Sequence, residues 1–188
     1  MDELAKEPAA VIEDYCHAIE HSIEFQVLFL QHLFGAGIRI LPVLCGSFAH
    51  SICNGGKPED DENVRAFLDR LGEIGAREGQ KLLWVLGIDM AHMGARYGDS
   101  FAASANSGIM TEVARRDSER MDQVMKSDPD HFWSLVQENE DDLKWCGSSP
   151  MYTFLRSIPG ARGSMRGYEQ WNIDAESVVS FAAMSFQK

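Results

Sequence analysis

The predicted fold is decided by residues 82–88, LLWVLGI. This continuous apolar run is typical of a strand in a parallel sheet that is covered on both faces. A second apolar and β-branched run, residues 38–44, lies between Gly37 and Gly46 and predicts another core strand, although Pro42 cannot donate to a ladder. We therefore expect an α/β fold, with a layered sheet and flanking helices.

Helical patterns surround these two runs. A helix that begins at Ser22 and ends at Gly35 is expected to be largely buried. Another helix should follow Pro58, because the acidic residues after it favour the positive end of a helix dipole. Further helices are predicted at residues 3–15, 107–127, 129–143 and 149–158, and late strands at residues 168–171 and 177–186. Nothing indicates a second domain, so we expect one domain over residues 1–188.

Composition excludes several classes of protein. The chain has 188 residues, of which 17 are basic and 29 acidic, giving a net charge of −12. Such a charge repels a phosphate backbone and an anionic membrane surface, so neither nucleic acid nor a membrane is an expected partner. No run approaches the roughly 20 apolar residues that span a bilayer, and residues 1–7 do not resemble a signal peptide. We expect a cytoplasmic protein.

The segment that follows the clearest predicted strand carries Asp89 and His92 on a loop containing Gly94. In an open α/β sheet, ligands bind at the carboxyl ends of the strands. A carboxylate and an imidazole there can orient each other for proton transfer, or can hold a metal ion or its bound water. The alternative is that Asp89 caps a turn and that His92 packs under a loop.

Two other positions are candidate metal ligands. His21 has Glu20 and Glu24 as neighbours, so it could supply an imidazole with a carboxylate beside it; the alternative is a solvated acidic turn. Cys146 precedes a glycine, two serines and a predicted helix, whose dipole would favour a thiolate; the alternative is an inert buried thiol. The four cysteines contain no Cys-x-x-Cys pair, which argues against a zinc ribbon or a disulfide-stapled module.

A different pattern overlaps the first of these positions. Residues 17–21, HAIEH, match the H-x-x-E-H arrangement of the inverzincin metalloproteases, in which two histidines one helical turn apart bind zinc. His17 separates this alternative from the others, because only the protease motif needs it as a ligand. Those proteases are much larger than this chain, and the motif also occurs by chance.

Taken together, five segments resemble the Memo family, and most closely the bacterial members called AmmeMemoRadiSam system protein B. They occur in the family's order and span the chain from about Glu20 onward. They are residues 20–24 (EHSIE), 40–44 (ILPVL), 88–97 (IDMAHMGARY), 145–147 (WCG) and 177–183 (SVVSFAA). The resemblance implies a fold like that of the class III extradiol dioxygenases, with one metal ion held by two histidines and a cysteine.

Carried over to this sequence, the resemblance implies that His21 and Cys146 are metal ligands and that Asp89 and His92 line the same site. The implied ion is iron or copper, because imidazole and thiolate ligands suit either. The implied chemistry is an oxygen-dependent redox reaction on an unknown small molecule or peptide. In it His92 would move protons and Asp89 would orient His92.

One part of the family pattern has no match. The family's other histidine ligand comes from a His-Ala-Gly-type segment upstream of the Glu-His-Ser-Ile-Glu motif, and nothing before Glu20 corresponds to it. We therefore expect the chain to be the C-terminal portion of a Memo-like protein that lacks its first strands. Such a chain would expose a sheet edge, and would pair with a separate N-terminal chain or with itself.

A binding module is the alternative from a different functional class. The same cleft would then hold a peptide or protein, with the metal structural or absent. Tyr97, Phe101, Trp145 and Arg96 could line it, because aromatic residues and arginine often anchor interfaces.

Overall fold

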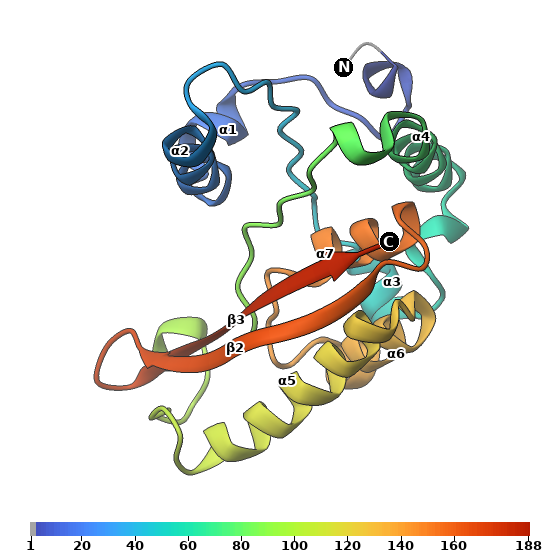
Figure 1. The fold of residues 1–188 in the computed structure, drawn as a ribbon. Coiled ribbons are helices and arrows are strands. Elements are labelled where there is room, and N and C mark those ends of the chain that lie inside the picture. Colours follow the sequence, from blue (N-terminus) through green and yellow to red (C-terminus); the bar gives the residue numbers. More distant parts are fainter. Residues whose placement is uncertain (1–2) are drawn as a thin grey trace. The chain divides into compact units, whose positions relative to one another are not determined.

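The computed structural model describes residues 3–188, which form two compact units (Figure 1). Of the described residues, the first unit comprises 3–46 and Pro58–Gly87, and the second comprises Ser47–Lys57 and Ile88–Lys188. The elements of the first unit are η1 (Leu4–Lys6), α1 (Tyr15–Ile19), α2 (Ser22–Phe34), η2 (Pro58–Asp60), α4 (Glu62–Glu78) and η3 (Gly79–Lys81).

Helix α4 carries the core of the first unit. The Asp61 carboxylate caps it by accepting the backbone N–H groups of Asn63, at 2.8 Å, and Val64, at 3.3 Å, as the acidic start after Pro58 predicts. Apolar residues recur on one face of the helix and are buried. The cluster consists of Leu4, Leu71 and Ile74, with Phe67 and Trp84 packed against it.

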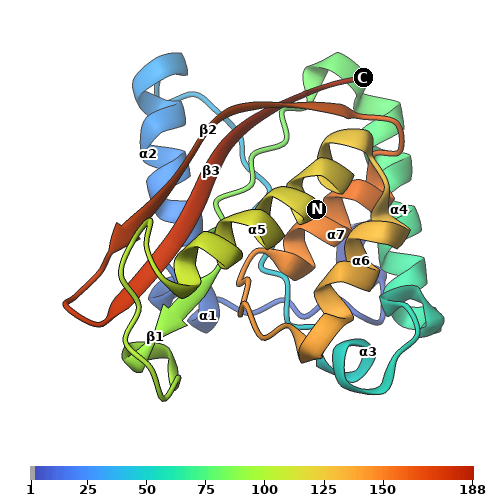
Figure 2. The same cartoon turned by 90° about the horizontal axis from the view of Figure 1, so that it is seen from below.

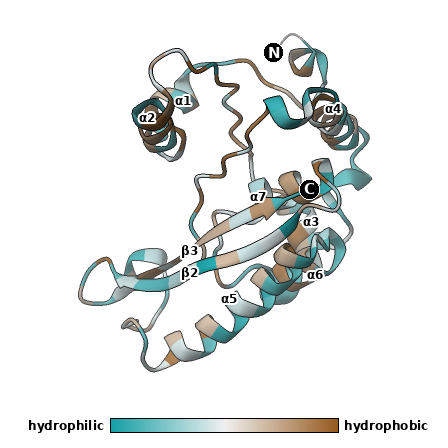
Figure 3. Ribbon diagram, in the orientation of Figure 1, coloured by the Kyte–Doolittle hydropathy of each residue, from teal (hydrophilic) through white to brown (hydrophobic). Residues whose placement is uncertain are grey.

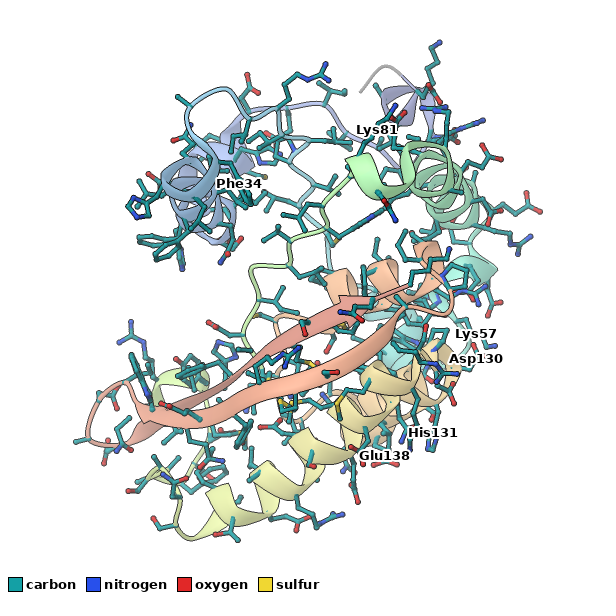
Figure 4. The ribbon with its side chains drawn as sticks, viewed as in Figure 1. Phe34, Lys57, Lys81, Asp130, His131 and Glu138 are labelled. Carbon is teal, nitrogen blue, oxygen red and sulfur yellow. The ribbon has the colours of Figure 1, made fainter. Side chains whose placement is uncertain are left out.

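Helix α2 confirms the predicted helix that ends at Gly35, whose φ of +82° lies in the left-handed region. The expectation that this helix is buried was wrong. None of its residues is buried, and Leu33 keeps 70% of its surface exposed. Figure 3 shows the hydrophobic residues on this helix, and Figure 4 labels Phe34 at its C-terminal end. Residues 3–15 also differ from prediction, because they form the short η1 and only the first residue of α1, Tyr15.

The two predicted core strands are not strands. Within residues 3–188, neither residues 38–44 nor residues 82–88 pair with a neighbouring strand. Leu83 is 65% exposed and Ile40 is 47% exposed, so neither run is covered on both faces. The prediction rested on apolar composition alone, but a strand also needs a partner that supplies its ladder of hydrogen bonds.

The exposed apolar residues of the first unit include Phe25, Leu28, Phe29, Leu33, Phe34, Ile40, Leu41, Leu83 and Val85. We expect Phe29→Lys and Leu83→Lys to lower the fluorescence of a bound apolar dye without lowering the free energy of unfolding, because neither side chain contributes a buried contact. Ile109→Lys, at an exposed position of the second unit, is the control and should leave dye binding unchanged. A loss of stability in either first-unit variant would contradict this expectation.

The second unit contains most of the regular structure. Its elements are α3 (Ala49–Asn54), β1 (His92–Gly94), η4 (Ala95–Tyr97), α5 (Ile109–Lys126), α6 (Pro129–Gln137), η5 (Glu138–Glu140), α7 (Ser148–Ser157), β2 (Arg162–Asn172) and β3 (Ser177–Gln187). The late helices and both late strands confirm the sequence predictions, although α6 ends earlier than expected. None of the helices within residues 3–188 is both long and apolar enough to cross a membrane.

The three strands form one antiparallel sheet in the order β1-β3-β2. Strands β2 and β3 make a long hairpin in which Trp171 pairs with Val179, and β1 adds to the other edge with His92 opposite Val179 (Figure 1). The expected α/β class is therefore observed as a small antiparallel sheet with flanking helices. The parallel sheet predicted from residues 82–88 is absent from residues 3–188.

Helix α5 runs along strand β2, α6 packs against α5, and α7 packs against α6 (Figure 2). The core between them contains Phe132, Trp133 and Tyr152, which are at most 1% exposed. The Asp128 side chain caps α6 by accepting the N–H of His131 at 3.0 Å. Near this start, Lys57 Nζ donates to Asp130 Oδ1 at 2.8 Å (Figure 4).

Candidate metal centre

Three potential metal ligands meet in the second unit. The ligand atoms of Asp89, His92 and Cys146 all lie within 4.8 Å of one another. Asp89 and Cys146 are exposed, and His92 is half-buried, so the group is open to solvent on one side. The structure thus brings Cys146 to the loop on which the sequence places Asp89 and His92.

The segment that carries Asp89 and His92 is fixed by backbone hydrogen bonds to β3. Met90 donates to the Ser180 carbonyl and Ser180 donates to the Ala91 carbonyl, each at 2.9 Å. The N–H of His92 donates to the carbonyl of Leu143 at 2.9 Å. These bonds hold the backbone between the two side chains.

Cys146 reaches this segment because Gly147 follows it. The Gly147 N–H donates to the Asp89 carbonyl at 3.2 Å, and a Cβ at Gly147 would lie only 2.8 Å from that oxygen. Only glycine allows this close approach without a shift. The Cys146 Sγ lies 3.5 Å from the same carbonyl oxygen, and helix α7 begins at Ser148, one residue before the predicted start.

The ring of His92 is oriented by two backbone carbonyls. Its Nδ1 lies 2.9 Å from the Met90 oxygen and 3.1 Å from the Lys144 oxygen. Because both partners are acceptors, these contacts assign the proton of the neutral ring to Nδ1. The lone pair of Nε2 is then available to bind a metal ion or accept a proton.

Tyr97 packs its ring edge-to-face on His92, with the ring centroids 4.9 Å apart. Burial raises the pKa of Tyr97, and the positive charge of Arg96 opposes the rise, while Asp89 and Cys146 add to it. The phenol is therefore neutral beside the candidate ligands and restricts the rotation of His92.

A buried carboxylate lies behind the candidate ligands. Asp117, on α5, is fully buried and accepts three hydrogen bonds: Trp145 Nε1 at 2.7 Å, Tyr168 OH at 2.8 Å and Ser180 Oγ at 2.6 Å. Burial raises the pKa of Asp117, and these hydrogen bonds limit the rise. Asp117 was missed from sequence, although a helix whose buried face includes Val113 and Met121 also places Asp117 there.

The raised pKa of Asp117 predicts a pH-dependent stability difference. The folded protein holds this proton more tightly than the unfolded chain, so the stability it contributes is present below the ordinary pKa of 3.8 and is lost as the pH rises through the folded pKa. Asp117→Asn does not titrate. We expect wild type to lose stability relative to Asp117→Asn as the pH rises above about 4, measured by urea unfolding. Parallel pH profiles would contradict this.

His21 belongs to the first unit, where it is the exposed N-cap residue of α2. The Glu20 carboxylate accepts the backbone N–H groups of His21, at 2.8 Å, and Ser22, at 2.9 Å, and lies 3.5 Å from His21 Nδ1. The carboxylate neighbour expected for His21 is thus present. A metal shared by His21 and Cys146 stays a prediction.

The metalloprotease pattern does not form. Helix α1 ends at Ile19, and Glu20 is extended, with φ −91° and ψ 131°. His17 and His21 therefore do not lie one turn apart on a continuous helix, which is the geometry that H-x-x-E-H requires. The motif match in the sequence was misleading because α1 ends inside it and α2 begins only after it, at Ser22.

One of the residues expected to line the alternative peptide-binding cleft, Trp145, is buried. Trp145 is only 4% exposed, and its indole is turned inward onto Asp117. It packs between Phe132, with ring centroids 6.0 Å apart, and the guanidinium of Arg120, 5.2 Å from the indole centroid. Trp145 therefore supports the segment that carries Cys146 and is not available to contact a partner.

Comparison with known proteins gives one consistent family. The sequence model of the family described as "Memo-like protein" matches residues 1–185. A MEMO1 family protein of Desulfurococcus amylolyticus is 22% identical over 182 residues, which are 94% of this chain and 55% of that relative. A MEMO1 family protein of Methanosarcina barkeri is 24% identical over 177 residues, 92% of this chain and 57% of the relative. The chain spans about half the length of the curated relatives it matches.

Proposed function

Because this chain belongs to the Memo-like protein family, we propose that Asp89, His92 and Cys146 hold a single iron or copper ion that supports oxygen-dependent redox chemistry. The observation that carries the proposal is the meeting of three ligand atoms of different chemistry within 4.8 Å. The substrate class is a small organic molecule or a peptide, which the half-open site would admit.

The donor set fits the implied ions. A thiolate and an imidazole suit iron and copper, whereas magnesium and calcium prefer oxygen ligands alone. The Nε2 atom of His92 is free to bind, since carbonyl oxygens orient its Nδ1 in the way that second-shell groups commonly orient metal-bound histidines. Binding of a metal would replace the contact of the Cys146 thiol with the Asp89 carbonyl.

Each residue has a distinct role in this proposal. Cys146 anchors the ion as a thiolate, and His92 binds it or exchanges a proton with a substrate next to it. Asp89 supplies a carboxylate ligand or orients a bound water, and Tyr97 keeps the His92 ring in place. The bound metal would act as a Lewis acid and electron-transfer centre with coordination positions open to oxygen or substrate.

The family resemblance adds two further elements to the proposal. His21 would be an additional imidazole ligand, and the complete fold would be like that of the class III extradiol dioxygenases.

The test is anaerobic loading with Fe(II) and with Cu(I), followed by elemental analysis of the purified protein. Wild type should bind one equivalent, and Cys146→Ala and His92→Ala should each lose it. Cys53→Ala, which removes an exposed cysteine from α3, is the matched control and should bind as wild type does.

The outcomes separate the alternatives. Equal metal content in wild type, Cys146→Ala and His92→Ala would remove the assignment. If His21→Ala lost the metal, His21 would be an additional ligand from the first unit. If His21→Ala kept the metal, all ligands would come from the second unit. Absence of tight binding in wild type would favour the metal-free peptide-binding module.

A further inference from the structure

The carboxylate of Asp117 connects the two backbone segments that carry the candidate ligands. On one side, its Oδ1 accepts the indole N–H of Trp145 at 2.7 Å, and Trp145 is the residue before Cys146. On the other side, its Oδ2 accepts the hydroxyl of Ser180 at 2.6 Å. Ser180 Oγ in turn accepts the backbone N–H of Ala91 at 2.9 Å, and Ala91 lies between Asp89 and His92.

We propose that Asp117 is a positioning residue that sets the spacing between Cys146 and the Asp89–His92 pair. The metal-binding part of this inference rests on the proposed function, whereas the positioning itself concerns the side chains of the metal-free protein. Asp117 touches none of the three candidate ligands, so it acts through Trp145 and Ser180.

The connection is suited to this role because its residues are buried and shielded from water. Asp117, Ser180 and Ala91 are fully buried, and Trp145 is 4% exposed, so water does not compete for these hydrogen bonds. A carboxylate has enough lone pairs to accept from Trp145, Tyr168 and Ser180 at once.

Asparagine at position 117 should keep part of this connection. Its amide oxygen can accept from Trp145, but its N–H groups would face the hydroxyl oxygens of Tyr168 and Ser180, whose O–H groups then lose their acceptor. Alanine at position 117 removes all three contacts. Trp145→Phe removes only the indole N–H and keeps an aromatic ring beside Arg120 and Phe132.

The experiment compares Asp117→Ala, Asp117→Asn and Trp145→Phe with Val124→Ala. Val124 is fully buried on the same helix, about two turns after Asp117, so its truncation is the control for general loss of packing. The first readout needs no metal: the rate of alkylation of Cys146 by iodoacetamide, relative to the exposed Cys53 of the same molecule, by mass spectrometry. The second is the dissociation constant for Co(II), with the position of its thiolate charge-transfer band.

We expect Asp117→Ala to raise the Co(II) dissociation constant about 10- to 100-fold, as is typical when an outer-shell partner is lost. The Cys146:Cys53 rate ratio should rise, because the segment that carries Cys146 loses its connection to Asp117. Trp145→Phe should change both values in the same direction, and Asp117→Asn, which keeps an acceptor for Trp145, should stay closer to wild type than Asp117→Ala. If Asp117→Ala does not fold, Trp145→Phe alone tests the positioning role. If these variants gave the same dissociation constant and rate ratio as Val124→Ala, the positioning role would be overturned. Failure of wild type to bind Co(II), Fe(II) or Cu(I) would overturn the proposed function alone, since the alkylation ratio still tests Asp117.

Discussion

Gly94→Ala is expected to lower the free energy of unfolding by about 3 to 5 kcal/mol, because it combines a backbone clash with a strained conformation. Gly94 has a φ of +104°, and a Cβ there would lie 2.0 Å from the carbonyl oxygen of Glu176. The Glu176 oxygen is a backbone atom and cannot turn away as the end of a side chain could, so β1 and β3 would have to separate. Urea unfolding followed by circular dichroism measures the loss.

Two glycines provide the matched controls for this effect. Gly98 has a φ of +84°, but a Cβ added there would have nothing within 4 Å, so Gly98→Ala should cost about 1 kcal/mol from strain alone. Gly167→Ala has neither problem and should be neutral. If Gly94→Ala were no worse than Gly98→Ala, the tight pairing of β1 with β3 would be refuted.

Arg120→Ala is the second large effect, with an expected loss of about 3 to 5 kcal/mol. Arg120 is 2% exposed; it donates to Asp141 Oδ1 at 2.7 Å and to the Leu135 carbonyl at 3.0 Å. Its removal leaves the Asp141 carboxylate, whose side chain is only 11% exposed, without its ion-pair partner. It also removes the cation that stacks on Trp145.

Arg115, on the same helix, is the control for this substitution. It forms ion pairs with Glu112 and Glu119, but its side chain is 55% exposed. Exposed pairs contribute little, so Arg115→Ala should cost less than about 1 kcal/mol. Equal losses for the two arginine variants, measured by urea unfolding, would show that burial of the Arg120 pair is energetically unimportant.

The predictable part of the fold is the part that local sequence determines. Helices α4 and α5 and the β2–β3 hairpin follow from caps, periodicity and β-branched runs near one another in the chain. Residues 82–88 were misassigned because a strand depends on a distant partner as well as on its own composition, and no strand within residues 3–188 pairs with them.

The residues of the candidate site were also predicted only in part. Asp89 and His92 were identified from their position after an apolar run, and Cys146 from the helix that follows it; the structure brings all three together. Asp117 was missed because a single acidic residue inside a helix resembles any solvated position. Its contacts with Trp145 and Ser180 join residues that lie far apart in the chain, so no local sequence pattern indicates them.

The exposed apolar residues of the first unit have a consequence for the lifetime of the chain in a cell. Chaperones bind such side chains, and proteases degrade chains whose apolar surface stays uncovered. Leu33 and Leu83, each at least 65% exposed, would engage this quality-control machinery even though the second unit is well packed. The abundance of the protein should therefore depend on how soon these residues are covered after synthesis.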